Sequence, residues 1–136
     1  MPRVRELPPP PANPEQSPPA TVQGEELLTV PGLELDGERG PSLEARMRAP
    51  ANATRAVVLC HPHPLYGGTM HSAVPLAIAK VLAERGGDRV AHLRFNYRGV
   101  GASEGTYAEG RGEIDDARAA LRTLRAAAPE IGRAHV

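Results

Sequence analysis

One apolar segment followed by a proline-restricted loop constrains this chain more than any other feature. Residues 56–60 (Ala-Val-Val-Leu-Cys) have no polar face, which predicts a strand buried inside a sheet. The loop that follows reads His61-Pro62-His63-Pro64-Leu65. Because proline has no N–H, the free amides at the exit of the strand are those of His61, His63 and Leu65. A loop held by a rigid strand in this way can aim a backbone donor at a developing negative charge.

The two ends of the chain differ in composition from its middle. Residues 1–22 contain eight of the 15 prolines and few apolar side chains, so we expect a Pro-rich disordered tail. They lack the apolar core of a signal peptide, and the sequence has no membrane-spanning stretch, so we expect a cytoplasmic protein. We expect one partial domain over residues 23–129. Residues 130–136 resemble the translation of a common sequencing adapter, and we expect them to be a non-native tail.

Charge and cysteine content exclude some classes of function. The 16 Lys and Arg residues balance the 16 Asp and Glu residues, which argues against a nucleic-acid partner. The single cysteine, Cys60, rules out an internal disulfide. Neighbouring strand residues point to opposite faces, so Cys60 and His61 are not expected to form a nucleophile–base pair. Cys60 is instead expected to be a buried packing residue.

Strands that alternate with helices predict an α/β fold. We expect strands over residues 26–30, 33–35, 43–47, 56–60 and 89–95, and helices over residues 72–85 and 113–127. This order favours a parallel sheet with flanking helices, two central parallel strands and a meander at one edge. No strand follows the last helix, so the predicted sheet is half a fold. The predicted apolar stripes are Val74, Ile78, Val81 and Leu82 on the first helix, and Ile114, Ala117, Leu121 and Leu124 on the second.

Two segments resemble the α/β-hydrolase superfamily, and more narrowly the small bacterial predicted hydrolases with a His-Pro-His-Pro loop. The first is His-Pro-His-Pro-Leu-Tyr-Gly-Gly-Thr-Met over residues 61–70, and the second is Leu-Arg-Phe-Asn-Tyr-Arg-Gly-Val-Gly-Ala-Ser-Glu-Gly over residues 93–105. Residues 110–117 are similar to the start of a helix in that family. The resemblance implies the N-terminal half of an α/β-hydrolase fold, truncated before the nucleophile elbow.

The resemblance also implies a chemistry. It points to a serine hydrolase that cleaves a small-molecule ester or amide through an acyl-enzyme and needs no cofactor. It places the first oxyanion-hole donor at the backbone N–H of His63. The nucleophile, acid and base are then expected to be absent from this chain, so the fragment alone is expected to be inactive. Neither the substrate nor the oligomeric state is indicated.

A serine in a Gly-x-Ser-x-Gly pattern occurs at Gly101-Ala102-Ser103-Glu104-Gly105, but we interpret it as a turn. A nucleophile elbow passes directly into a helix, whereas a glycine-rich loop continues here to Gly112. Glu104 would also place a negative charge beside an anionic transition state. The same loop is a poor dinucleotide motif, because Glu104 stands where the third glycine is required.

Other polar residues leave alternatives open. His61 and His63 could share a face and bind a metal in a metal-dependent hydrolase, although no acidic ligand lies nearby in the sequence. His92 is expected to be a satisfied histidine of the core or of the sheet end. Asp115 and Asp116 are expected to stabilise a helix dipole or to pair with Arg98. The alternative outside enzymes is a non-catalytic binding or interaction protein.

Overall fold

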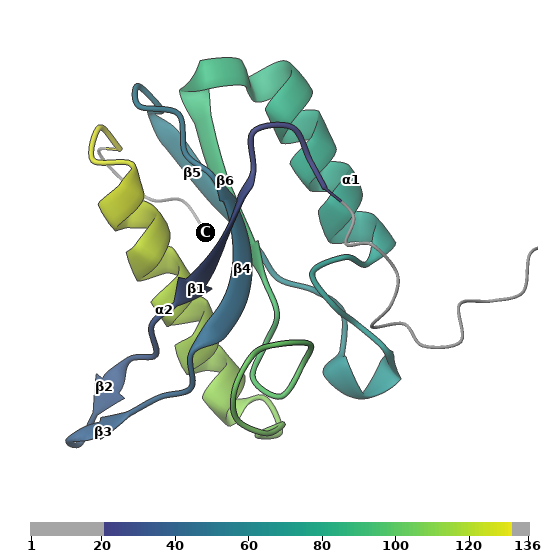
Figure 1. Ribbon diagram of the computed structural model, residues 1–136, viewed down its shortest axis with the longest axis vertical. Helices are drawn as coiled ribbons and strands as arrows, with labels where there is room; N and C mark the ends of the chain where they lie inside the picture. The colour runs from purple at the N-terminus through teal and green to yellow at the C-terminus, as the bar shows by residue number, and fades with distance from the viewer. Residues whose placement is uncertain (1–20, 132–136) are drawn as a thin grey trace, which may run out of the picture.

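The computed structural model describes residues 21–131, which form a four-stranded sheet with one long helix on each face (Figure 1). The predictions for residues 1–20 and 132–136 lie outside the described residues. Along the sheet the order is β1 (Glu26–Val30), β4 (Leu43–Arg48), β6 (Val90–Phe95) and β5 (Arg55–Leu59). β5 and β6 are parallel, whereas β4 pairs antiparallel with both β1 and β6. The expected parallel pair and the meander at one edge are confirmed, but the pair is not central, because β5 is the other edge strand of the described sheet, which is mixed overall.

The connection between the parallel strands is a helix that changes character at its end. α1 (Ala73–Val81) begins with Pro75 in its first turn, where the missing N–H removes no helical hydrogen bond. It continues as a π-helical turn, η3 (Leu82–Gly86), and a 3₁₀ turn, η4 (Gly87–Arg89), before β6 begins. Gly86 is required there, because a Cβ at this position would lie 2.9 Å from the Cβ of Val90. The helix predicted to reach residue 85 is therefore α-helical only to residue 81.

Two apolar clusters lie on opposite faces of the sheet. The larger cluster joins the sheet to α2 (Arg111–Ala127) and includes Val30, Leu43, Ala45, Leu93, Phe95, Ala119, Ala120 and Leu124. The smaller cluster joins β5 to α1 through Val22, Leu59 and Ala79. Because Val22 is buried there, the expected boundary between residues 22 and 23 falls inside the folded part of the chain.

The faces that the two helices bury differ from the predicted stripes. α1 buries Pro75 and Ala79, whereas Val74 is 65% exposed and Val81 is 50% exposed. Ala79 packs in a cluster with Leu59 of β5, where its small side chain lets the helix backbone approach the sheet closely. α2 buries Leu124 as expected, but its Ile114 is 58% exposed. Both apolar stripes thus turn partly away from the sheet.

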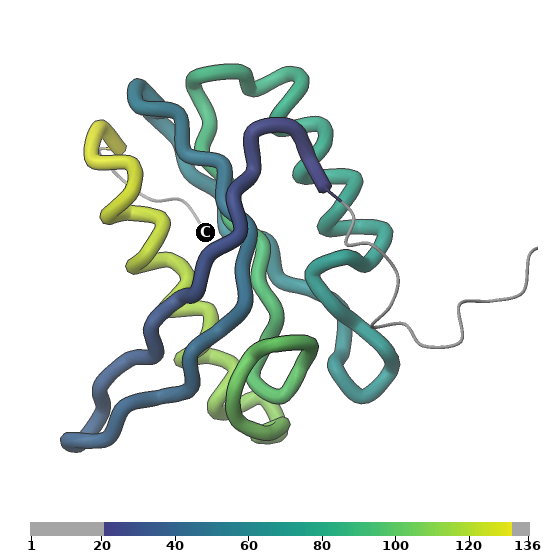
Figure 2. The backbone as a smooth tube through the Cα atoms, in the orientation of Figure 1, coloured from purple at the N-terminus to yellow at the C-terminus, as the bar shows by residue number. Residues whose placement is uncertain are grey.

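A short hairpin lies outside the main sheet. A hairpin of β2 (Glu34–Leu35) and β3 (Glu38–Arg39) projects beyond the sheet between β1 and β4 (Figure 2). The strand expected over residues 33–35 is one side of this hairpin. Within residues 21–131, none of the helices has both the length and the apolar character needed to cross a membrane.

Candidate active-site loop

The side chain of His61 is part of the scaffold of the loop that follows β5. The backbone N–H of Tyr97 donates to Nε2 of His61 at 3.1 Å. The ring proton therefore lies on Nδ1, which donates to the carbonyl of Pro62 at 2.7 Å. Burial lowers the pKa of His61, and the hydrogen bond to Pro62 opposes this only in part. His61 is consequently a neutral residue that joins the end of β5 to the segment after β6.

The ring of His63 is held between the loop after β5 and the loop after β6. The N–H of Leu65 donates to its Nδ1 at 3.1 Å, so the ring proton lies on Nε2. Nε2 then donates to the hydroxyl of Tyr107 at 3.1 Å. The ring of Tyr66 also contacts the ring of His63, with centroids 5.1 Å apart. The amide of Leu65, predicted to be free, is thus occupied by the His63 side chain, a partner that the sequence did not indicate.

The backbone of His63 is fixed on one side and open on the other. Its carbonyl accepts hydrogen bonds from the N–H groups of Tyr66 and Gly68, at 3.1 and 3.2 Å. Gly68 cannot be replaced without moving the loop, since a Cβ there would lie 2.0 Å from the carbonyl oxygen of Pro62. The N–H of His63 has no acceptor among residues 21–131. The loop therefore holds a backbone donor in a defined direction without using it.

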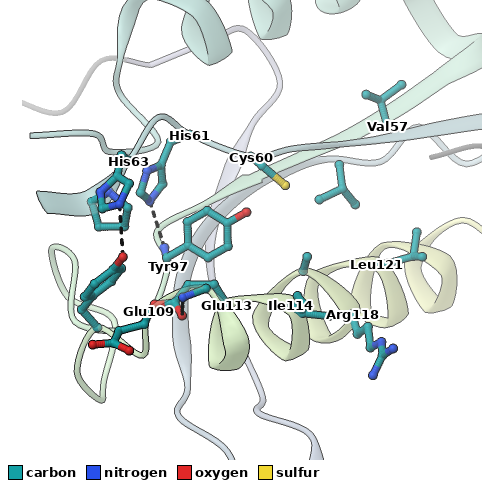
Figure 3. A pocket seen from close by; sticks show the side chains of 15 residues that line it. Val57, Cys60, His61, His63, Tyr97, Glu109, Glu113, Ile114, Arg118 and Leu121 are labelled. Carbon is teal, nitrogen blue, oxygen red and sulfur yellow. Dashed lines mark hydrogen bonds between the residues drawn. The ribbon is translucent and has the colours of Figure 1, made fainter. Parts of the chain in front are cut away.

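A cavity of about 740 Å³ lies beside this loop, between β5 and α2 (Figure 3). Its polar end contains His61, His63, Tyr97, Tyr107, Glu109 and Glu113, and its apolar walls come from Val57, Val58, Ile114, Ala117 and Leu121. Cys60 also lines the cavity and is exposed, which corrects the expectation of a buried thiol. The thiol is exposed because β5 ends at Leu59 and is the last strand on this side of the described sheet. Burial and the neighbouring Cys60 raise the pKa of Tyr97, so its phenol stays neutral.

The acidic residues at the start of α2 have structural partners. The carboxylate of Glu113 accepts hydrogen bonds from the N–H groups of Ala108 and Gly110, at 3.0 and 3.1 Å. It therefore caps the helix N-terminus, as its predicted place in the first turn suggested. Asp116 accepts three side-chain hydrogen bonds and one backbone hydrogen bond from Arg98, which confirms the expected pairing. Asp115 makes a longer contact of 3.4 Å with Arg118, its one ion pair within residues 21–131.

Ser103 is a buried structural residue. Its hydroxyl donates to the carbonyl of Asn96 at 2.6 Å and accepts from the N–H of Glu44 at 2.8 Å. The residue is 8% exposed, and the next helix begins only at Arg111. A hydroxyl committed in this way is not free to attack a substrate. The N–H of Ser103 donates to the carbonyl of Val100 at 2.9 Å, so the expected turn role is confirmed, while the absence of a nucleophile from this chain stays a prediction.

A buried ionic cluster under α1 was not predicted from the sequence. Glu25 pairs with Arg94 at 2.7 Å and with Nε2 of His92 at 3.1 Å, and all three side chains are fully buried. Burial raises the pKa of Glu25, but the hydrogen bonds from His92 and Arg94 outweigh it and bring the pKa down to about 2. Nδ1 of His92 has no partner within residues 21–131, so the expected satisfied histidine is only half satisfied. The sequence signal for this cluster was the presence of His92 and Arg94 inside the otherwise apolar strand β6.

The geometry does not favour a metal pair at His61 and His63. Nε2 of His61 accepts from the backbone, and both ring nitrogens of His63 are engaged by Leu65 and Tyr107. Within the described part of the chain, no three His, Cys, Asp or Glu side chains are grouped so that they could hold a metal ion.

Comparison with solved structures shows which known fold these residues share. An α/β serine hydrolase homologue from Coxiella burnetii is 34% identical, with a TM-score of 0.62, over 82% of this chain and 50% of that structure. A serine hydrolase without a lid from Xanthomonas campestris is 30% identical, with a TM-score of 0.64, over 84% of this chain and 50% of that structure. The described residues therefore have the fold of part of an α/β-hydrolase.

Sequence comparison adds a relative of unassigned function. An uncharacterized protein of Rickettsia prowazekii is 47% identical over 74 residues, which cover 54% of this chain and 29% of the relative. No family model matches the sequence. The chain spans about half the length of the two solved structures above and less than a third of the Rickettsia protein.

Proposed function

We propose that this chain supplies the oxyanion-binding loop of a serine hydrolase that cleaves a small-molecule ester or amide. The single observation that carries the proposal is that His63 lines a cavity in a fixed loop and that its backbone N–H has no acceptor among the described residues. Pro62 and Pro64 have no N–H, and the N–H of Leu65 is already used. A donor of this kind stabilises the negative charge that develops on a carbonyl oxygen during acyl transfer.

The remaining catalytic groups are proposed to lie outside this chain. Ser103 is committed to structural hydrogen bonds, and Glu113 and Asp116 to a helix cap and an ion pair. His61 and His63 are held by the backbone and by Tyr107. The nucleophile, its base and its acid would come from the part of the hydrolase fold that the chain does not span. The 136-residue chain alone is therefore proposed to be inactive.

The test uses the protein extended by the coding sequence downstream at its source locus. A fluorophosphonate probe should label a serine outside these 136 residues, and the 136-residue chain should remain unlabelled. Labelling of Ser103 would contradict the proposal. Absence of labelling in the extended protein would favour a non-catalytic binding protein. Activity that is lost on chelation and restored by zinc would favour the metal-dependent alternative.

The role of the amide can be separated from that of the ring with two variants of the extended protein. His63→Ala removes the ring and keeps the N–H, whereas His63→Pro removes both. Proline fits this position, because the φ angle of His63 is −49°. Loss of one oxyanion donor lowers kcat by about 100-fold to 1,000-fold, so His63→Pro should be slower than His63→Ala by that factor. Equal rates for the two variants would exclude the N–H as the donor.

A further inference from the structure

We propose that Tyr107 is a positioning residue, whose hydroxyl holds the ring of His63 and, through that ring, the loop after β5. Its effect on this loop is independent of the proposed function, whereas its effect on activity rests on that function. The observation that carries the proposal is a directed chain of hydrogen bonds. The chain runs from the N–H of Leu65 through both ring nitrogens of His63 to the hydroxyl of Tyr107.

The backbone sets the direction of this chain of hydrogen bonds. A backbone N–H can only donate, so Nδ1 of His63 accepts from Leu65 and carries no proton. The neutral ring then has its single proton on Nε2, which lies 3.1 Å from the hydroxyl oxygen of Tyr107 (dashed line at His63 in Figure 3). Without that hydroxyl, the Nε2 proton would have no acceptor among residues 21–131. The ring would keep only its hydrogen bond with Leu65, two residues further along the chain.

Tyr107 gives His63 a partner from a distant part of the chain. The other hydrogen bonds of His63 are local, since its ring bonds to Leu65 and its carbonyl to Tyr66 and Gly68. Tyr107 lies 44 residues further along the chain, in the loop between β6 and α2. Its ring also contacts the ring of His63, with centroids 5.4 Å apart. Tyr107 therefore joins the part of the loop that carries the open N–H to a second loop.

The segment that carries Tyr107 is itself held in place. The N–H of Ala108 donates to the carboxylate of Glu113 at 3.0 Å, which ties the segment to the first turn of α2. Gly99 has a φ of +77°, and a Cβ there would lie 3.2 Å from the backbone nitrogen of Tyr107. Glycine at this position lets the start of the loop lie close to its later part. A side chain supported in this way can fix the group that it contacts.

Tyr66 provides a matched control. Its ring also contacts the ring of His63, with centroids 5.1 Å apart. The residue is 87% exposed, and its hydroxyl makes no hydrogen bond within residues 21–131. Tyr107→Phe therefore removes a hydroxyl that holds His63, whereas Tyr66→Phe removes one that does not. Both variants keep the ring contacts.

The first measurement follows the loop in the extended protein. Hydrogen exchange of the Leu65 amide, observed by NMR, reports how often the loop opens. The net contribution of one hydrogen bond corresponds to about fivefold in an equilibrium constant, so exchange should be about fivefold faster in Tyr107→Phe. Exchange in Tyr66→Phe should equal that of the wild type, and thermal melting checks that both variants are folded. Equal exchange in Tyr107→Phe and the wild type would overturn the proposal.

The second measurement separates positioning from direct contact with the substrate. Because the His63 ring is the intermediary, Tyr107→Phe should lower kcat by about fivefold at unchanged KM, and should cause no further loss in the His63→Ala background. A kcat equal to that of the wild type, or a loss that persists in the His63→Ala background, would overturn the positioning role. Equal rates for His63→Pro and His63→Ala, with faster exchange in Tyr107→Phe, would contradict the proposed donor and still support the role of Tyr107 in the loop.

Discussion

The carboxylate of Glu25 ties the segment before β1 to the central strand β6. It is fully buried, and its hydrogen bonds reach Arg94 and His92, which lie 69 and 67 residues further along the chain. Arg94 in turn donates to the carbonyl of Met70 at 2.9 Å, in the loop before α1. The Glu25–Arg94 pair therefore joins three separate segments under α1.

Replacing Glu25 should lower stability in a pH-dependent way. Its pKa in the folded protein is about 2, below the ordinary value of 4.5, so its contribution is complete above about pH 4.5 and is lost as the pH falls towards 2. Glu25→Gln should reduce the free energy of unfolding by roughly 3 kcal/mol at pH 7. Urea unfolding from pH 2 to 8 measures this difference, which should shrink below pH 4.5. The exposed neighbour provides the control, since Glu26→Gln should change little at any pH.

Removing the hydroxyl of Ser103 should affect stability and not reactivity. Ser103→Ala leaves the carbonyl of Asn96 and the N–H of Glu44 without their partner, which costs about 1–3 kcal/mol. Denaturant unfolding measures the loss. Fluorophosphonate labelling of the extended protein should be the same in the variant and the wild type. A decrease in labelling of the folded variant would mean that Ser103 takes part in catalysis.

For single residues, the sequence predicted the structural role better when the hydrogen-bond partners were near in the chain. The turn role of Ser103 could be inferred from the late start of the next helix. The pairing of Asp116 with Arg98 spans 18 residues and was among the expectations. The partners of Glu25 lie more than 60 residues away, and no local pattern indicates them. Cys60 was misassigned because its burial depends on whether another strand lies beside β5.

Among the elements, α2 shows how two adjacent carboxylates can differ. Asp116 is 2% exposed, and its carboxylate accepts hydrogen bonds from the guanidinium and from the backbone N–H of Arg98. Asp115 faces an arginine, Arg118, that is mostly exposed. The Asp116 contact holds the loop that follows β6 against the first turns of α2. This loop carries Tyr107, the partner of His63.

The same substitution at the two positions should therefore have unequal effects. Asp116→Asn weakens a buried, bidentate pair, and we expect a loss of about 3 kcal/mol in the free energy of unfolding. Asp115→Asn removes a surface contact worth less than about 1 kcal/mol. Thermal or denaturant unfolding of the two variants, compared side by side, measures the difference. Similar losses would show that the Arg98 pair does not stabilise the fold.

The residue ranges of the helices and strands were predicted more accurately than the faces that the helices bury. β1 and the C-terminal end of α2 match the expected bounds, and β6 begins one residue later than expected. Periodicity locates an apolar stripe, but it does not say what the stripe will contact. The buried residues of α1 are Pro75 and Ala79, which are too small to dominate a hydrophobic pattern. Val74, Ile78 and Val81 of the stripe remain exposed, and Leu82 is half-buried.

For the whole molecule, the described core lies between the sheet and α2. Leu124→Ala should cost about 2–5 kcal/mol, because the side chain is fully buried in the larger cluster. Val81→Ala should change the free energy of unfolding by less than about 0.5 kcal/mol, because half of that side chain is exposed on α1. Denaturant unfolding of both variants provides the measurement. A large loss for Val81→Ala would mean that the outer face of α1 is covered in solution.

The fold class followed from the order of strands and helices, while the mixed character of the sheet did not. Alternation with helices predicts parallel strands, and that rule holds for β5 and β6. The antiparallel pairing of β4 with β6 joins residues about 50 positions apart, and only the assembled sheet reveals it. The cavity and the open amide of His63 likewise depend on how the loops after β5 and β6 meet.

The strand order has a consequence for synthesis on the ribosome. β6 is made last of the four strands, yet it lies between β4 and β5. β1 and β4 can pair as soon as both have emerged, but among the described strands β5 has no neighbour until residue 95 follows. During that interval an apolar strand is open to chaperones and to other nascent chains. The speed of translation between codons 60 and 95 therefore determines how long the growing sheet is vulnerable to misassembly.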